Sequence, residues 1–173
     1  MTSPRPCIRK VTAQEVHEAW LLEKQNCPSE ENLPEEIFEF RQRVAPELFW
    51  GYFEDSRLFG ITSGSKTSMN KATNDSRLTH DPSGSVVCLH TLRVHPDFQG
   101  QGIETVLVEN FVWYVEENLG NVRKICLVCN DVMIPFYEGL GFRCLGVSSE
   151  IIQGSKSWFD MEYCVSPEAT SFT

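Results

Sequence analysis

The stretch from Cys88 to Phe142 constrains the fold more than any other part of the chain. It predicts a strand over residues 86–94, a glycine-bearing turn over 95–102, a helix, a second strand over 125–129 and a short helix. Small residues between Gln99 and Gly102 let backbone N–H groups turn toward an anion, and the next helix directs its positive end to the same place. This order of elements predicts a phosphate-binding turn that leads into a reaction centre.

The bulk properties indicate one domain over residues 1–173, with a core of about 8–165 and a frayed tail at 166–173. The net charge of −9 disfavours nucleic acid as a partner, because that function needs a basic surface. Neither a run of about 18 apolar residues nor a secretory signal occurs, so no membrane partner is expected. Seven cysteines, an odd number without CxxC spacing, indicate reduced thiols, no metal site and a cytoplasmic location.

Hydrophobic periodicity and turn residues divide the rest of the chain into short elements. Thr12 and Glu15 form a capping-box pattern at the start of a helix that runs to about residue 25. Residues 63–83 are rich in Ser, Thr, Asn and Asp, and they predict an exposed excursion between strands. The remaining elements expected are strands at 7–11, 48–53, 57–62, 144–149 and 158–165, a second helix at 34–45, and a polar flap at 26–34.

The spacing Gln99-x-x-Gly102, between a strand and a helix, resembles the acetyl-CoA loop of the GNAT superfamily of acyltransferases. The segment from Asn130 through Tyr137 to Phe142 is similar to the second cofactor motif of that superfamily. The resemblance implies a single GNAT-type α/β (α+β) domain with a mixed, mostly antiparallel sheet flanked by helices. That sheet would splay between the strand of His90 and the strand that ends at Cys129, and the gap would admit acetyl-CoA.

A closer resemblance is to the arylalkylamine N-acetyltransferases, serotonin N-acetyltransferase-like, of the shorter fungal and invertebrate type. It covers about residues 8–163 and is carried by residues 44–54, the His90 strand, residues 129–137 and Gly154-Ser155 ahead of Trp158. It implies direct transfer of acetyl from acetyl-CoA, a co-substrate, to a primary amine in a ternary complex. The expected substrates are tryptamine, serotonin or phenethylamine, or polyamines, which the acidic loop 29–36 suits. A monomer without a phosphorylation-dependent partner is expected.

Amine acetylation requires a base, a positioned thioester and an acid for the departing thiolate. His90 is the candidate base because imidazole titrates near neutral pH, although a lone histidine is often structural. Cys88 lies two residues earlier, on the same strand face, where the vertebrate enzymes have a second histidine. A thiol is a poorer base, so proton removal would rest on His90 or on water. Tyr137 is the candidate acid; the alternative is a core aromatic pair with Phe136.

The resemblance also assigns cofactor contacts. The backbone of Leu92 and Val94, flanking Arg93, would pair with the pantetheine arm, and Asn130 and Tyr137 belong to the second motif. The pyrophosphate would be held by Gln99, Gly100, Gln101, Gly102, Ile103, Glu104 and Thr105. Glu104 stands where the pattern expects Gly or Ala. Its carboxylate repels a pyrophosphate, so it must turn outward or the affinity for acetyl-CoA suffers.

The resemblance maps the substrate pocket onto Trp20, Pro28, Val128, Gln153, Lys156 and Trp158. The two tryptophans could enclose a flat arene or an alkyl chain, or they could be ordinary core. We expect Lys156 to point to solvent, because an inward ammonium would disfavour cationic amines. Two alternatives remain open: a protein or peptide N-acetyltransferase, which would need an open groove, and a weakly active CoA-binding module, motivated by Cys88 and Glu104.

Overall fold

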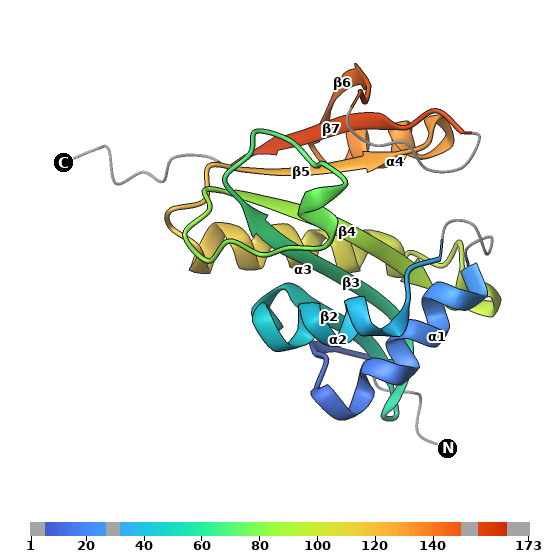
Figure 1. Ribbon diagram of the computed structural model, residues 1–173. Helices are drawn as coiled ribbons and strands as arrows, with labels where there is room; N and C mark the ends of the chain where they lie inside the picture. The colour runs from blue at the N-terminus through green and yellow to red at the C-terminus, as the bar shows by residue number, and fades with distance from the viewer. Residues whose placement is uncertain (1–5, 27–31, 150–155, 166–173) are drawn as a thin grey trace.

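The computed structural model describes residues 6–26, 32–149 and 156–165, and its centre is a twisted sheet (Figure 1). In this described part the sheet has seven strands in the order β1-β2-β3-β4-β5-β7-β6. The strands are β1 Pro6–Lys10, β2 Phe49–Glu54, β3 Arg57–Thr67, β4 Val86–Val94, β5 Lys124–Cys129, β6 Arg143–Val147 and β7 Phe159–Cys164. Neighbouring strands are antiparallel except β4 and β5, which are parallel. The predicted mixed, mostly antiparallel sheet is therefore confirmed.

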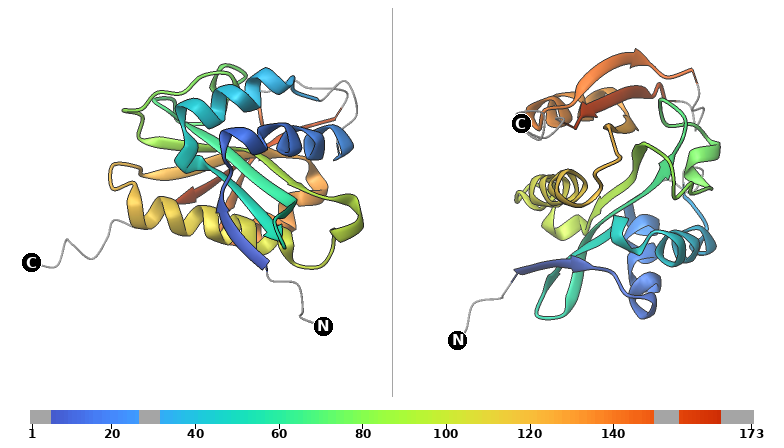
Figure 2. Two further views of the ribbon diagram at one scale, coloured as in Figure 1. Left: turned by 90° about the horizontal axis from the view of Figure 1, so that it is seen from below. Right: turned by 90° about the vertical axis from the view of Figure 1, so that its left-hand side faces the viewer.

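Helices cover both faces of this sheet, as Figure 2 shows. They are α1 Val16–Asn26, α2 Glu35–Val44, α3 Ile103–Asn118 and α4 Ile134–Gly139. The first two lie on one face and α3 on the other, where Val108, Phe111 and Val115 at helical spacing are fully buried. Within the described ranges, none of the helices combines the length and the apolar character that a membrane span requires.

The start of the chain is joined to the first helical turn by Glu15, as the capping-box pattern predicts. Its carboxylate accepts a hydrogen bond from the backbone N–H of Thr12 at 3.0 Å. The same carboxylate binds both Nη atoms of Arg9 in β1, at 2.9 and 2.7 Å. One side chain therefore connects the edge strand to the helical layer.

Strand β3 is longer than the sequence predicts. Residues 63–67, expected to open an exposed excursion, continue the strand to Thr67, and Ser63 and Ser65 are buried. Their hydroxyl groups find partners far along the chain: Ser63 accepts from Arg41, and Ser65 donates to the carbonyl of Ser76. Because a buried hydroxyl costs little once it is hydrogen-bonded, this polar segment is stable inside the sheet.

Strands β4 and β5 stay together for only three residue pairs, from Val86 opposite Lys124 to Cys88 opposite Cys126. Beyond Cys88 the two strands diverge. From Leu89 to Val94, all residues of β4 except His90 therefore pair with β3 along one edge, and none pairs with a described strand along the other. The divergence occurs between the two strands that the sequence predicts will splay.

Candidate active site

The divergence of β4 and β5 opens a cleft of about 360 Å³. Side chains from both strands, from the start of α3 and from α4 line it. Among the residues that the sequence predicts for the site, the cleft brings together His90, Leu92, Arg93, Val94, Gln99, Glu104, Val128, Asn130, Tyr137, Lys156 and Trp158. Residues separated by as many as 68 positions in the chain therefore face one space.

His90 sits at a bulge in β4. Ser63 lies opposite Thr91 and Gly64 lies opposite Leu89, so His90 is the additional residue without a partner in β3. A bulge turns a side chain out of the regular alternation of a strand and is frequent beside reaction centres. The close approach needs glycine, because a Cβ atom on Gly64 would lie 2.4 Å from the carbonyl oxygen of Cys88.

A hydrogen-bond chain assigns the tautomer of the His90 ring. The hydroxyl of Ser65 donates to the carbonyl oxygen of Ser76 at 3.0 Å and also lies 2.8 Å from His90 Nε2. A hydroxyl has one proton to donate, so Nε2–H of His90 is the donor to Ser65 Oγ. The neutral ring then carries its basic lone pair on Nδ1.

The surroundings keep His90 uncharged. Burial lowers the pKa of His90 well below its ordinary value of 6.5, and the positive charges of Arg41 and Arg77 lower it further. The imidazole is consequently neutral at physiological pH. Neutral imidazole with a fixed tautomer is the form that can accept a proton from a substrate.

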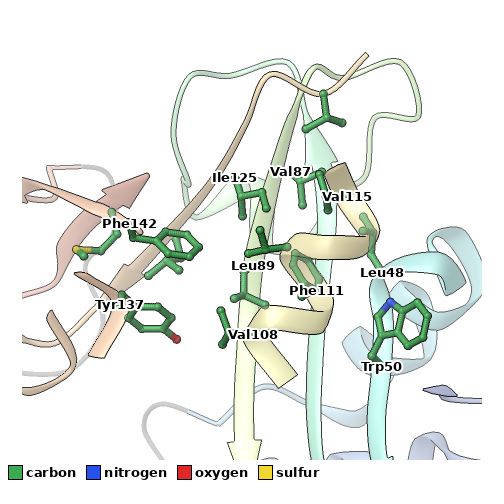
Figure 3. Close-up of a cluster of buried hydrophobic side chains, with 14 of the residues drawn as sticks. Leu48, Trp50, Val87, Leu89, Val108, Phe111, Val115, Ile125, Tyr137 and Phe142 are labelled. Carbon is green, nitrogen blue, oxygen red and sulfur yellow. The ribbon is translucent and has the colours of Figure 1, made fainter. Parts of the chain in front are cut away.

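Tyr137 faces the cleft from α4. Its ring packs edge-on against Phe136 and Phe142, with ring centroids 5.0 and 5.5 Å apart, and the side chain is 6% exposed. Figure 3 shows the ring directed from α4 toward β4, with its hydroxyl in the space between them. Burial raises the pKa of Tyr137, so the phenol retains its proton at neutral pH. The residue is both packed against aromatic neighbours and directed at the cleft.

Cys88 lies behind the cleft rather than in its lining. The side chain is fully buried, and its Sγ is 3.2 Å from Sγ of Cys126 on β5. It packs with Ala72, Val86 and Cys126 in a small apolar cluster. The structure thus brings His90 and Tyr137 to the cleft but leaves Cys88 in the core.

The predicted phosphate-binding turn is open. Gly100 and Gly102 have φ angles of +78° and +87°, and a Cβ on either would meet nothing within 4 Å. Both conformations belong to the left-handed region that glycine adopts without strain. Of the predicted residues 99–105, Gln99 and Glu104 line the cleft, and the others, including Gly100 and Gly102, lie outside its lining. Ile103 is buried against Val94 and Leu107. The backbone before α3 is therefore accessible and ends at a helix N-terminus.

Glu104 lies in the first turn of α3, half-buried, and lines the cleft. It therefore lies beside the predicted phosphate-binding turn. The expected penalty for binding a phosphate there therefore stays a prediction. Gln99, at the start of the turn, donates to Asn26 Oδ1 at 2.6 Å and to the Val94 carbonyl at 3.2 Å.

Arg93 connects the cleft to α1. Its Nε donates to the buried carboxylate of Glu23 at 2.7 Å, and its Nη1 donates to the Leu92 carbonyl at 3.1 Å. Across the cleft, Asn130 Oδ1 accepts from the backbone N–H of Met133 at 3.2 Å. This bond caps the turn that precedes α4.

The predicted substrate residues divide into three groups. Val128 and Trp158 are half-buried in the cleft, and Lys156 is exposed at its edge, which agrees with an ammonium that contacts solvent. Trp20 is outside the described lining and donates from Nε1 to the Leu33 carbonyl at 2.9 Å. Pro28, Gln153 and residues 29–31 of the predicted acidic loop lie outside the described residues.

The sequence analysis did not assign to the site six residues of the lining, which are Asn26, Arg77, Leu89, Thr91, Cys129 and Met133. It also missed Arg41 and Ser65, which lie outside the lining and hydrogen-bond to Thr91 and His90. Ser65 and Arg77 fall within the segment predicted as an exposed excursion. Arg41 carries one usable signal, since it follows Phe38 by three residues on the buried face of α2. Within the described ranges, no group of three or more His, Cys, Asp or Glu is arranged to hold a metal ion.

Comparison with known sequences finds the family model described as "Acetyltransferase (GNAT) family" matching residues 13–142. Serotonin N-acetyltransferase of Mesocricetus auratus is 34% identical over 122 residues, which cover 69% of this chain and 56% of the relative. The Macaca mulatta enzyme of that name is 33% identical over 121 residues, with coverages of 68% and 57%. These alignments span little more than half of the length of either relative.

Comparison with solved structures shows the same fold at low identity. The loading GNATL domain of CurA from Lyngbya majuscula superimposes with a TM-score of 0.81 at 15% identity, covering 93% of this chain and 98% of that one. Naa50 of Arabidopsis thaliana, solved with a bisubstrate analogue CoA-Ac-MVNAL, gives a TM-score of 0.69 at 15% identity, with coverages of 91% and 97%. A GNAT-like decarboxylase, GphF, solved with isobutyryl-CoA, gives 0.79 at 16% identity, with coverages of 92% and 99%. Shared architecture alone therefore does not specify the reaction.

Proposed function

The chain belongs to the acetyltransferase (GNAT) family, and from that premise we propose that it transfers acetyl from acetyl-CoA to the primary amine of an arylalkylamine. The observation that carries this proposal is the cleft itself. A neutral imidazole with a fixed tautomer and a protonated phenol face one space, beside an open glycine turn at a helix N-terminus. The serotonin N-acetyltransferase relatives support the choice of amine.

The residues around the cleft fit acetyl-CoA. Open backbone at Gly100 and Gly102, followed by the N-terminus of α3, is suited to a pyrophosphate. The edge of β4 from Leu89 to Val94, left without a partner by β5, is suited to an extended pantetheine arm. When bound, acetyl-CoA supplies an electrophilic thioester carbonyl and a thiolate leaving group.

In the proposed mechanism, His90 accepts through Nδ1 a proton from the substrate ammonium, directly or through water. The free amine can then attack the carbonyl. The lowered pKa of His90 keeps the ring neutral, so that the Nδ1 lone pair is available to accept the proton. Tyr137 gives its phenolic proton to the sulfur as the carbon–sulfur bond breaks. Proton removal and proton delivery are thus assigned to opposite walls of the cleft.

The amine side of the cleft favours a substrate with a flat apolar part. Trp158 and Val128 are both half-buried there, and an aromatic ring can stack on the indole. Lys156 lies at the exposed edge, where water screens its charge from a cationic amine. These features support arylalkylamines over polyamines.

The proposal is tested by mixing the protein with acetyl-CoA and an amine panel and measuring released thiol. The panel contains tryptamine, phenethylamine, a linear polyamine and a peptide with a free N-terminus. We expect the two arylalkylamines to give the highest kcat/KM. A higher kcat/KM for the peptide or the polyamine would reject the proposed substrate class, and acetyl-CoA binding without thiol release would reject the enzyme activity.

A further inference from the structure

We propose that Arg41 is a positioning residue for His90, whose buried guanidinium holds together the three segments that orient the imidazole and opposes its protonation. This inference rests on the proposed function only in giving His90 the role of base. The mechanism above assigns Arg41 no part, and the side chain does not line the cleft. It lies on α2 and is 1% exposed.

The guanidinium of Arg41 reaches a different segment with each of its three hydrogen bonds. Nη1 donates to Ser63 Oγ on β3 and to Thr91 Oγ1 on β4, both at 3.1 Å. Nη2 donates to the carbonyl oxygen of Arg77 at 2.9 Å, in the short turn Asp75–Arg77. A planar fork with several fixed donors is suited to joining three separate acceptors, which a lysine ammonium cannot match.

The three acceptors adjoin the residues that orient His90. Thr91 follows His90, Arg77 follows Ser76, and Ser63 lies two residues before Ser65 at the bulge. The chain Ser76–Ser65–His90, which assigns the tautomer, therefore has Arg41 bonded beside each of its members. Loosening Arg41 would let β3, β4 and the turn shift independently, and the imidazole would lose its single orientation.

The positive charge of Arg41 also favours the neutral form of the His90 imidazole. Among the described residues it forms no ion pair with a carboxylate, and its buried Nε has no hydrogen-bond partner. Burial lowers the pKa of Arg41 to about 9, so it remains charged at neutral pH. The pKa of His90 is in turn lowered by burial and then by Arg41 and Arg77. A buried cation close to the imidazole disfavours a second positive charge on that ring.

The other charged and titratable groups around His90 come from every neighbouring element. Arg77 and Arg93 are positive, and the Arg93 charge is offset by Glu23 from α1. Burial raises the pKa of Tyr137 from α4, and the hydrogen bond with Cys88 raises the pKa of the Cys126 thiol, so both keep their protons. Glu104 from α3 and Cys129 from β5 line the same cleft, and Lys156 lies at its exposed edge. The carboxylates among these groups are Glu23, which is bound to Arg93, and Glu104, which lies in the first turn of α3.

A purely structural role for Arg41 predicts loss of stability without a change in the titration of His90. We therefore compare Arg41→Met and Arg41→Lys with Arg43→Met, an exposed arginine of the same helix. The pKa of His90 is measured by NMR without any substrate, among the four histidines of the chain, and assigned with His90→Gln. The pH profile of kcat/KM is measured in parallel.

We expect Arg41→Met to raise the pKa of His90 by about one unit and to move the acid limb of kcat/KM to higher pH by the same amount. Arg43→Met should leave both unchanged. Arg41→Lys should keep the pKa, because it keeps the charge, and lower kcat about tenfold, because one ammonium cannot hold three acceptors in place. A folded Arg41→Met protein with the wild-type pKa of His90, or wild-type kcat in Arg41→Lys, overturns the proposal.

Should Arg41→Met fail to fold, Thr91→Val provides the second test. It removes the Thr91 Oγ1 acceptor and preserves the shape of the side chain and the charge of Arg41. We expect a lower kcat with an unchanged pKa of His90, and wild-type kcat would overturn the positioning role. The NMR titration uses no substrate, so its result does not depend on the proposed function. If the protein acetylated none of the amines, the proposed function would be rejected, and the measured pKa of His90 would still test the role of Arg41.

Discussion

Tyr137 provides the proton that the proposed mechanism delivers to sulfur. Replacing it with phenylalanine keeps the aromatic packing on Phe136 and Phe142 and removes only the hydroxyl. We expect Tyr137→Phe to lower kcat about 100-fold, with little change in the KM for acetyl-CoA. Steady-state kinetics measure this, with Tyr114→Phe, a half-buried tyrosine packed on Trp50, as the control. Full activity in Tyr137→Phe would show that another group protonates the thiolate.

Glu104 places a negative charge in the first turn of α3 and in the lining of the cleft. A carboxylate stabilises a helix N-terminus but repels a pyrophosphate bound there. We expect Glu104→Gln to lower the Kd for acetyl-CoA about threefold to tenfold at low salt, and less at high salt, because ions screen the repulsion. Isothermal titration measures this, and Glu109→Gln, on an exposed position of the same helix, is the control. An unchanged Kd at low salt would mean that the phosphates bind elsewhere.

At the scale of elements, the turn before α3 depends on backbone conformation rather than on side chains. Gly102 has a φ of +87° and open space around it. An alanine at this position would therefore have a strained backbone conformation but no steric clash. We expect Gly102→Ala to cost about 1 kcal/mol of stability and to raise the KM for acetyl-CoA. Urea unfolding and kinetics measure the two effects. Gly120→Ala is the matched control, since its surroundings are equally open and its φ is ordinary; an equal KM in both variants would exclude a role for the turn.

The joint between β1 and α1 depends on the ionisation of Glu15. Hydrogen bonds from Arg9, first, and from Thr12 lower the pKa of Glu15 from 4.5 to about 2. A carboxylate with a lowered folded-state pKa contributes stability above pH 4.5, and that contribution is lost as the pH falls from 4.5 to about 2. We expect Glu15→Gln to cost about 1 kcal/mol at pH 7 and much less near pH 2. Urea unfolding at both pH values measures this, with exposed Glu18→Gln as the control; a pH-independent cost would contradict it.

Sequence patterns predicted the elements of this fold well where a local signal exists. The glycine turn, the capping box at Thr12 and the apolar β5 strand all carry such signals, and all are confirmed by the structure. The resemblance to arylalkylamine N-acetyltransferases is likewise confirmed by the serotonin N-acetyltransferase relatives. The second half of β3 was not predicted because a serine-rich sequence is typical of a loop, and the hydrogen-bond partners that stabilise these serines in a strand are not visible in the sequence. Those partners lie 11 to 25 residues away along the chain: Ser76 and His90 for Ser65, and Arg41 for Ser63.

For the same reason the site was only partly predictable. His90 and Tyr137 stand beside recognisable motifs, whereas Ser65 and Arg77 become part of the site only through tertiary contacts. A burial pattern can indicate that Arg41 faces inward, but not which acceptors it meets. The sequence likewise does not indicate that Cys88 packs in the core, because its neighbour Cys126 on β5 lies 38 residues later in the chain.

At the scale of the whole molecule, the sheet consists of two parts that meet at one short parallel joint. Strands β1 to β4, with α1 to α3, form the first part, and β5 to β7, with α4, form the second (Figure 1). The β4–β5 pairing extends over three residue pairs, and α3 packs across the apolar core. The proposed acetyl-CoA contacts are divided between the parts, with Gly102 on one and Asn130 and Tyr137 on the other. A ligand in the cleft would therefore connect them.

This division predicts how acetyl-CoA affects stability. A ligand that binds the folded protein alone, at a concentration of 100 Kd, adds about 2.7 kcal/mol. For a chain of 173 residues this corresponds to a rise in Tm of roughly 5–10 °C. Calorimetry with acetyl-CoA measures the rise, and Gly102→Ala should reduce it at the same ligand concentration, whereas Gly120→Ala should not. A protein whose Tm rises equally with adenosine alone would show that the pantetheine arm does not connect the two parts, because adenosine lacks the segment that extends along the edge of β4.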